Sequence, residues 1–240
     1  MATLLVYLLL GHVVGDFVLQ SSALVAAKRT RAGALLRHVL LVTAAHAVAL
    51  LPFPADRWLW LLPLLALAHA AIDALKAAFE RRRGETLGGF AADQALHLAC
   101  LVAAAALADP GHAALPPPEL TRAAAVATAY VACVLGGSAV VRLVLARFPL
   151  RPDADGEGDG PSPWRMGHAI GVLERALGLT FVLLDAWAGL GGVIAAKSIA
   201  RFKDLERRHF GEYYLVGTLT SLLVTVAVGA ATVRALRHLA

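Results

Sequence analysis

The stretch GHVVGDFVLQ, residues 11–20, lies inside the first strongly apolar segment of the chain, yet it carries His12, Asp16 and Gln20 at four-residue intervals. Residues four apart lie on nearly the same face of an α-helix. A charged side chain in the middle of a membrane helix costs about 2.5–3.5 kcal/mol on insertion scales. The stretch therefore predicts a membrane helix with one polar face that needs a partner inside the protein.

The whole chain is as apolar as this stretch. Of its 240 residues, 59% are hydrophobic and only 16% are charged, and the mean hydropathy is +0.68. These values exclude a soluble domain of this size. A run of about 20 apolar residues crosses a hydrocarbon core of about 30 Å. We expect an all-α, polytopic transmembrane helical bundle with about seven membrane segments, six to eight being compatible with the sequence. The seven segments are residues 3–22, 34–53, 58–79, 89–108, 120–146, 170–199 and 214–235.

The first segment fits a retained span better than a cleaved signal peptide. A signal peptide begins with a basic region, and residues 1–11 contain no charged side chain. Asp16 would also interrupt the apolar region of such a peptide. We therefore expect this segment to remain part of the bundle.

Basic residues indicate how the chain crosses the membrane. They gather after the first segment, from Lys28 to Arg37, and after the third, from Lys76 to Arg83. The positive-inside rule places both connections in the cytoplasm and the N-terminus outside. Simple alternation then puts the basic stretch 197–214 outside, against the rule. A break within DAWAGLGG, residues 185–192, would turn segment 170–199 into a re-entrant pair of helices and remove this conflict.

Composition divides the chain into three parts. We expect a four-helix membrane half at 1–108, a fifth span with a flexible Pro/Gly/Asp-rich cytoplasmic loop at 109–168, and a C-terminal membrane half at 169–240. The loop is centred on residues 152–163. The charged connection at 197–208 predicts one interfacial amphipathic helix, whose basic face contacts anionic headgroups.

Polar residues of the first four segments fall at one depth. With a rise of about 1.5 Å per residue, the first and third segments each place a histidine about 15 Å and an aspartate about 9 Å from the cytoplasmic end, and the fourth places its aspartate at about 6 Å and its histidine at about 12 Å. In every pair the carboxylate lies on the cytoplasmic side, although the fourth helix runs in the opposite direction. Independent accidents would not follow helix direction. We name this set the His/Asp layer: His12, Asp16, His38, His69, Asp73, Asp93 and His97.

The His/Asp layer predicts a metal site. Aspartates inside a membrane bundle need a compensating cation, water or partner. Imidazole nitrogens and carboxylate oxygens together suit zinc, manganese or iron. We expect a divalent metal, zinc first, and the layer offers enough ligands for two ions. One of its carboxylates would remain available as a general base.

Several neighbouring residues are expected to support these ligands. Gln20 lies near the mouth of the site and His46 lies deeper than the layer. Lys76 follows Asp73 by three residues, so it could neutralise Asp73, bind an anionic substrate, or extend to the headgroups. The GxxxG pair of Gly11 and Gly15 predicts the close approach of a neighbouring helix.

Four stretches of the chain resemble one known family. They are GHVVGDFVLQ (11–20), HAAIDALK (69–76), FAADQALH (90–97) and AAKSIARFKDLERRHFGEYYLVGTLTS (195–221). Together they are similar to bacterial integral inner-membrane proteins of domain-of-unknown-function family 3307. The resemblance implies a multi-pass protein of the bacterial inner membrane and no established activity. The His-x3-Asp spacing alone also resembles that of membrane-bound metal-dependent hydrolases and of zinc-dependent phospholipase C-like bundles.

The leading hypothesis for function is a metal-dependent hydrolase that acts on a lipid-linked or phosphate-ester substrate through metal-activated water. Its expected partners are membrane lipids and that substrate, with no nucleic acid. A cation or proton transporter could use the same layer, but it would need access from both sides of the membrane. Haem held between histidines and a scaffold protein are further alternatives.

Overall fold

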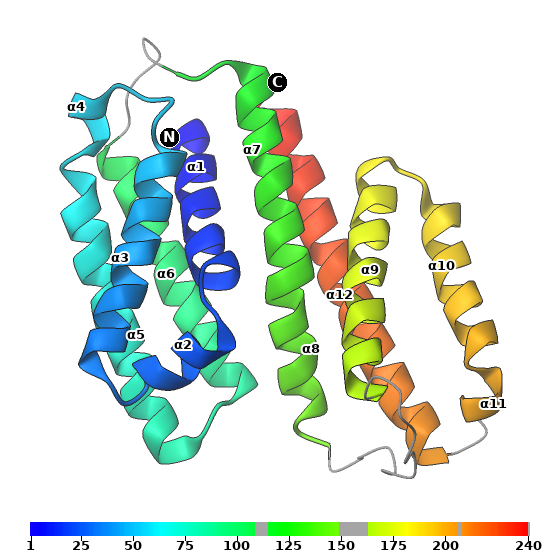
Figure 1. The fold of residues 1–240 in the computed structure, drawn as a ribbon. Helices are drawn as coiled ribbons and strands as arrows, with labels where there is room; N and C mark the ends of the chain where they lie inside the picture. The colour runs from blue at the N-terminus through cyan, green and yellow to red at the C-terminus, as the bar shows by residue number, and fades with distance from the viewer. Residues whose placement is uncertain (109–114, 149–162, 206–207, 240) are drawn as a thin grey trace. The chain divides into compact units, whose positions relative to one another are not determined.

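The computed structural model describes residues 1–108, 115–148, 163–205 and 208–239, and over these residues the protein is all-α (Figure 1). Among them, five helices are long and apolar enough to cross a membrane, and a bent pair at the N-terminus makes up to six. The chain is therefore a multi-pass membrane protein. The predicted segment 170–199 is not a single span in the structure, which divides it between two helices, Pro163–Leu183 and Trp187–Ala200.

The chain forms two compact units. Unit 1 comprises Met1–Val131 together with Ala235–Ala240, and unit 2 comprises Ala132–Arg234. In unit 1, helix α1 contacts α3, α6 and α7, and α5 contacts both α3 and α6. The elements of unit 1 are α1 (Ala2–Val13), η1 (Val14–Val18), α2 (Ser22–Lys28), α3 (Ala32–Ala49), α4 (Ala55–Trp58), α5 (Leu61–Arg83), α6 (Leu87–Leu107) and α7 (Pro118–Val131).

The first predicted span, 3–22, is not one straight helix. The α-helix ends at Val13 and continues as the π-helical turn η1, in which the Leu19 amide donates to the Val14 carbonyl over 2.9 Å. The chain then bends by 94° into α2. Ser21 caps α2, since its hydroxyl accepts a hydrogen bond of 3.3 Å from the Leu24 amide. The bend brings α2 against α3 instead of extending the span.

The GxxxG prediction is confirmed, and the partner helix is α3. A Cβ added to Gly11 would lie 2.8 Å from the His46 Cα, and one added to Gly15 would lie 2.9 Å from the Val42 Cα. Real Cβ atoms are not found at such distances from a backbone carbon. The two glycines therefore let the backbones of the first and second spans touch.

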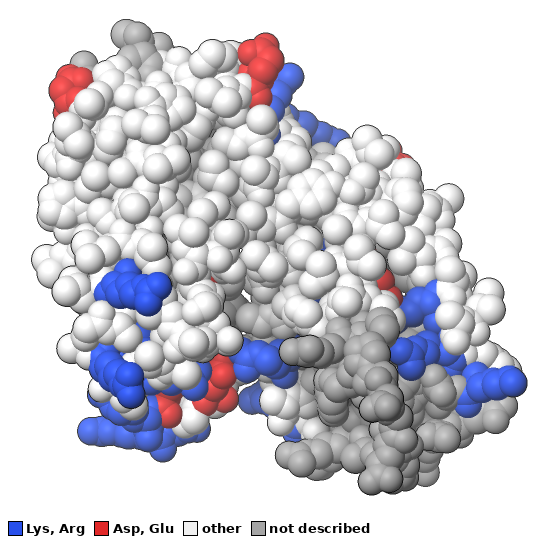
Figure 2. Space-filling view, viewed as in Figure 1, with Lys and Arg blue, Asp and Glu red and all other residues white. Residues whose placement is uncertain are grey.

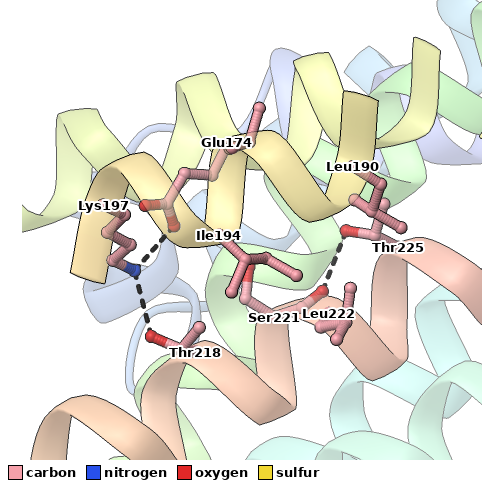
Figure 3. Close-up of a pocket in the computed structure, with 9 residues that line it drawn as sticks. Glu174, Leu190, Ile194, Lys197, Thr218, Ser221, Leu222 and Thr225 are labelled. Atoms are coloured by element: carbon pink, nitrogen blue, oxygen red, sulfur yellow. Dashed lines mark hydrogen bonds and ion pairs between the residues drawn. The ribbon is translucent and has the colours of Figure 1, made fainter. Parts of the chain in front are cut away.

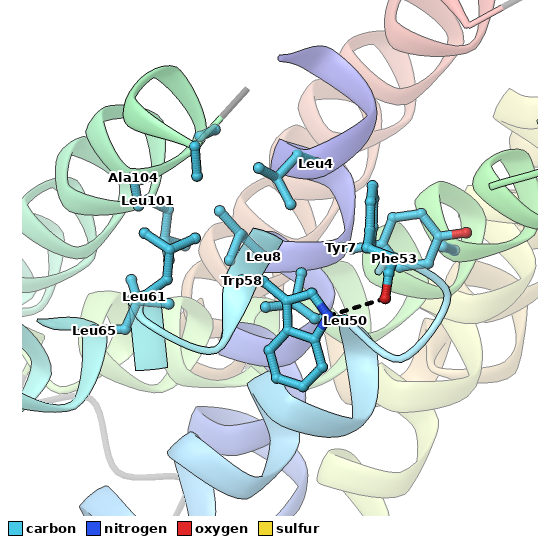
Figure 4. Packing of buried hydrophobic residues seen from close by; sticks show 13 residues of the cluster. Leu4, Tyr7, Leu8, Leu50, Phe53, Trp58, Leu61, Leu65, Leu101 and Ala104 are labelled. Atoms are coloured by element: carbon cyan, nitrogen blue, oxygen red, sulfur yellow. Dashed lines mark hydrogen bonds between the residues drawn. The ribbon is translucent and has the colours of Figure 1, made fainter. Parts of the chain in front are cut away.

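One end of unit 1 is closed by apolar side chains (Figure 4). They come from the start of α1, the end of α3, the start of α5 and the end of α6, and include Leu8, Leu50, Leu61 and Leu101. These four side chains are at most 3% exposed. Lys and Arg side chains gather at the opposite end of unit 1, at the lower left of Figure 2. We call the first of these the apolar end of unit 1, because its interior is filled by apolar side chains, and the second the charged end.

Unit 2 contains η2 (Ala132–Gly136), α8 (Gly137–Leu145), α9 (Pro163–Leu183), α10 (Trp187–Ala200), α11 (Phe202–Leu205) and most of α12 (Arg208–His238). The predicted break near residue 185 is confirmed. Asp185 has a positive φ of 55°, and its carboxylate accepts a hydrogen bond of 2.6 Å from the Trp187 indole at the start of α10. The chain thereby reverses, and α9 and α10 pack against each other.

The prediction of one continuous amphipathic helix at 197–208 is wrong. Helix α10 ends at Ala200, α11 has only four residues, and residues 206–207 lie outside the described part of the chain. Lys197 turns into unit 2, where Glu174 accepts its hydrogen bond. This half-buried ion pair removes Lys197 from the basic face on which the prediction rested. Of the predicted flexible loop 152–163, only the last residue is described.

Candidate metal site

The His/Asp layer converges inside unit 1. Its members come from α1, η1, α3, α5 and α6, so helices far apart in the sequence contribute to one place. Six of the seven form three overlapping groups whose possible ligand atoms lie within 4.8 Å of one another. The groups are His12, Asp16 and His97; Asp16, His38 and His69; and His69, Asp73 and His97. The predicted convergence is confirmed for these six residues and not for Asp93, and the metal stays a prediction.

Asp16 lies at the centre of the cluster. Its Oδ1 is 3.4 Å from the His38 Nε2 and 3.5 Å from the His69 Nε2, while its Oδ2 is 3.8 Å from the His12 Nε2. The carboxylate belongs to η1, and π-helical turns recur at functional sites because they re-aim a side chain within a helix. Its Oδ1 is buried and has no hydrogen-bond partner. This oxygen is thus available to a ligand surrounded by imidazoles.

The imidazole rings contact one another. The His69 ring centroid lies 4.4 Å from that of His97 and 5.0 Å from that of His38, and the His12 and His97 rings stack at 4.9 Å. The Nε2 atoms of His38 and His69 are 3.0 Å apart. Asp73 borders the same pair, with its Oδ2 3.3 Å from the His38 Nε2. Nitrogen and oxygen atoms therefore face a common centre.

Backbone hydrogen bonds orient two of the histidines. The Nδ1 of His97 lies 2.9 Å from the Asp93 carbonyl oxygen, and the Nδ1 of His46 lies 2.9 Å from the Val42 carbonyl oxygen. A carbonyl only accepts, so each Nδ1 carries the proton and each Nε2 presents a lone pair. Both Nε2 atoms are buried without a hydrogen-bond partner. A hydrogen bond of this kind commonly fixes the ring of a metal-ligating histidine.

Two lysines neutralise two of the aspartates, in a pairing that the sequence did not reveal. Lys28 of α2 donates to the Asp73 Oδ2 over 2.7 Å and to the Gln20 Oε1 over 3.1 Å. Lys76 donates to Asp93 over 2.7 Å and not to Asp73, the partner considered from sequence. Lys28 was missed because its position in a basic connection indicated only a cytoplasmic loop. Gln20 supports the site by holding Lys28.

Asp93 lies outside the three ligand groups. Besides Lys76, its Oδ2 accepts a hydrogen bond of 3.1 Å from the Gln94 side-chain amide. The Gln94 Oε1 in turn lies 3.3 Å from the His12 Nε2. Gln94 was also missed, although it adjoins Asp93 in the sequence. Asp93 and Gln94 therefore form a border of the cluster that connects Lys76 to His12.

Ion pairs hold α2 across the charged end of unit 1. The Arg29 Nε lies 2.8 Å from a Glu80 oxygen, and the Arg29 Nη2 lies 3.2 Å from a Glu85 oxygen. Arg81 donates to the Arg29 carbonyl over 2.9 Å. These contacts tie the end of α2 to α5 and to the turn that follows it. Lys28 is thereby positioned to reach Asp73.

Unit 2 has a polar cluster of a different kind. The buried Arg175 donates from Nε to the Val134 carbonyl over 3.2 Å and from its two terminal nitrogens to the Ser221 and Ser138 hydroxyls. Beside it, Lys197 bonds Glu174 over 2.7 Å and Thr218 over 3.1 Å (Figure 3). A cavity of about 30 Å³ is lined by apolar side chains and by the polar residues Glu174, Lys197, Thr218, Ser221 and Thr225. Among the described residues, the groups with metal-ligand spacing lie in unit 1.

A comparison with known families supports the family resemblance for the N-terminal part of the chain. The model of the family described as a protein of unknown function (DUF3307) matches residues 4–116. The matched range contains the whole His/Asp layer and ends before the motif at 195–221. No curated protein and no solved structure matches the chain. The looser similarity to membrane hydrolases thus rests on ligand spacing alone.

Proposed function

We propose that unit 1, which carries the family match, binds a divalent metal ion, zinc being the best fit, and uses it to hydrolyse a lipid-linked or phosphate-ester substrate. The proposal is carried by two buried acceptor atoms, Asp16 Oδ1 and His97 Nε2, whose residues belong to the same ligand group. Neither atom has a hydrogen-bond partner. Leaving such a group unpaired costs about 1–3 kcal/mol. A bound cation removes this cost for both atoms at once.

The charges of the cluster favour one metal ion. Three aspartates and two lysines leave one net negative charge when the histidines are neutral. One divalent ion converts this to one net positive charge, which a hydroxide or an anionic substrate balances. A second ion would leave three positive charges in a buried site, and buried charge without compensation is expensive. We therefore favour a single ion over the pair that the number of ligands would permit.

The ion would supply a water molecule of lowered pKa and a positive charge at the developing oxyanion. The protein's own backbone would orient one of the ligands, because the Asp93 carbonyl fixes the His97 ring through its Nδ1. Asp16, with one oxygen free of hydrogen bonds, is the carboxylate best placed to accept a proton from that water.

The apolar end of unit 1 favours hydrolysis over transport. A carrier needs access to the site from both sides of the membrane, whereas a hydrolase needs only one. Leu8, Leu61 and Ala105 on the apolar side of the layer are at most 1% exposed. The ring contacts likewise disfavour haem, because three imidazole pairs lie only 4.4–5.0 Å apart and leave no space for a porphyrin between them.

Metal analysis of the purified full-length protein tests the proposal. After dialysis against zinc and then against buffer, we expect about one zinc per chain by mass spectrometry, and loss of that zinc in Asp16→Ala and Asp73→Ala. The matched control is His168→Ala, since His168 is an exposed histidine of unit 2. Metal at trace level in the wild-type protein, or full retention in both aspartate variants, would refute the site.

Activity is measured separately on the same preparations. We expect zinc-dependent release of phosphate from p-nitrophenyl phosphate or from phosphatidic acid in vesicles, abolished by Asp16→Ala and retained in His168→Ala. Zinc binding without hydrolysis of either compound would leave a metal site but reject the phosphate-ester hydrolase.

A further inference from the structure

We propose that Lys28 is an anion-binding residue that a metal ion releases from Asp73, so that the loaded site takes a substrate with a negatively charged phosphate group. The inference rests on the proposed function and narrows its substrate class. It assigns different roles to Lys28 and Lys76, although both make ion pairs of the same length.

The two lysines differ in the aspartate that they contact. Lys28 pairs with Asp73, which belongs to a group with metal-ligand spacing. Lys76 pairs with Asp93, which lies outside all three groups and is also bonded by Gln94. A metal ion would therefore compete with Lys28 for its carboxylate and leave the ion pair of Lys76 intact.

The competition concerns a single oxygen atom. The Asp73 Oδ2 accepts from Lys28 over 2.7 Å and also lies 3.3 Å from the His38 Nε2. A zinc ion bonds carboxylate oxygen at about 2.0–2.2 Å. Two cations at the same oxygen in a poorly solvated site repel each other strongly. The ammonium must move away from the metal or share an anion with it.

Lys28 cannot move far from the site. Its amine is held by Gln20 over 3.1 Å, and the next residue, Arg29, is fixed by Glu80 and Glu85. Its side chain is only 10% exposed. The released ammonium would therefore stay beside the metal, on the side away from the apolar end. A phosphate oxygen bridging the two cations satisfies both.

Net charge points to the same ligand class. With one divalent ion the cluster carries one positive charge, which a neutral ester leaves uncompensated and a phosphate monoanion neutralises. Lys and Arg side chains at the same end of unit 1 (Figure 2) would raise the local concentration of anions. Lipid phosphates and soluble phosphates share this chemistry.

The proposal predicts that zinc and phosphate bind cooperatively, because coupling between two ligands is reciprocal. Zinc affinity of the full-length protein is measured against a chromogenic chelator that is calibrated in each buffer. For the wild-type protein we expect inorganic phosphate to tighten zinc binding about tenfold, a typical coupling. Lys28→Met should bind zinc more tightly than wild type without phosphate and lose the phosphate effect.

Three variants make this result specific. Lys28→Arg keeps a cation and should retain most of the coupling. Lys76→Met also lowers the net charge of the cluster by one, but it should keep more of the coupling than Lys28→Met because its ammonium contacts Asp93, outside the ligand groups. Lys203→Met removes an exposed lysine of unit 2 and should behave as wild type. Retention of the full phosphate effect in Lys28→Met, or equal loss in Lys76→Met, would overturn the proposal.

The source of the phosphate is resolved with nanodiscs. Zinc affinity is compared in phosphatidylcholine alone and with added phosphatidic acid. A response to phosphatidic acid supports a lipid substrate, and a response to inorganic phosphate alone supports a soluble one. Zinc binding that is indifferent to both refutes the role of Lys28, whereas absence of zinc binding refutes the proposed function itself.

Discussion

The two units each bury a cluster of charged side chains, but they satisfy it differently. In unit 1, acceptor atoms of Asp16 and His97 lie buried with no hydrogen-bond partner. In unit 2, Arg175 has three donor contacts to oxygen atoms. An unmet acceptor inside a ligand group is an atom that a bound cation would satisfy, whereas a donor surrounded by oxygen has a structural role. Burial of charge alone would not distinguish the two.

The exception in unit 2 has its own explanation. The Glu174 Oε1 is also buried without a hydrogen-bond partner. It borders the cavity of about 30 Å³ that Thr218, Ser221 and Thr225 line with hydroxyls (Figure 3). A water molecule needs about 10–15 Å³ of such volume and two to four polar partners. The cavity therefore has room for a water molecule, which would satisfy Glu174 without a metal.

The largest expected effect distinguishes two histidines of unit 1 by their contribution to zinc binding. His97 and His46 share a bond from Nδ1 to a carbonyl and an unpartnered Nε2, but only His97 belongs to a ligand group. We expect His97→Gln to weaken zinc binding by about 100-fold or more, since loss of even a residue that supports a ligand costs about 10–100-fold. His46→Gln should bind zinc as wild type does. Equal losses in both would mean that an unmet acceptor does not by itself locate the metal.

The next largest effect is expected in unit 2. A Cβ on Gly137 would lie 2.9 Å from the Arg175 Cδ, so the arginine fills a space that the glycine leaves. Arg175→Ala would empty this space and leave hydroxyl and carbonyl groups unpaired, and we expect about 3 kcal/mol of lost stability with unchanged zinc content.

A thiol-reactive dye provides the measurement in a Cys100→Ser background, because Cys133 is fully buried in unit 2 and should react on unfolding, whereas Cys100 is only half-buried. Arg234→Ala, which removes an exposed arginine of the same unit, should change the unfolding temperature little. If Arg175→Ala unfolds at the wild-type temperature, the structural role assigned to Arg175 is wrong.

Much of the His/Asp layer was predictable because its geometry is local. A four-residue spacing places two side chains on one helical face, and helix direction fixes their relative depth. The approach of α3 was signalled by Gly11 and Gly15, whose missing side chains leave room for His46 and Val42.

The part that escaped prediction depends on the path of the chain between helices. Lys28 reaches Asp73 only because η1 is followed by a 94° bend, and no proline marks that bend in the sequence. The ion pair of Lys197 with Glu174 likewise joins residues on two helices. Such pairs follow from tertiary packing, so residue spacing does not reveal them.

A smaller effect is expected where the helices touch. Gly15→Ala would place a methyl group against the Val42 backbone, and overpacking typically costs about 1–3 kcal/mol. Because Asp16 is the next residue, we also expect weaker zinc binding. The control is Gly33→Ala, where an added Cβ meets no atom within 4 Å. Wild-type unfolding and zinc affinity in Gly15→Ala would show that the close approach of α1 and α3 is not needed for the site.

The smallest expected effect is on the stability of the metal-free protein, and its sign shows whether Asp16 is an unsatisfied buried charge. In protein stripped of metal, Asp16 is a buried carboxylate with an oxygen that has no hydrogen-bond partner. Asp16→Asn removes its charge at nearly constant shape, so the metal-free variant should be as stable as wild type or more stable by about 1 kcal/mol. Zinc should stabilise the wild-type protein by an amount that rises with the logarithm of its concentration above the Kd, and leave the variant unchanged. Thermal unfolding with and without zinc measures both. A metal-free Asp16→Asn protein that unfolds well below wild type would mean that the carboxylate is already satisfied by its neighbours, as Arg175 is, and the distinction between the two clusters would be lost.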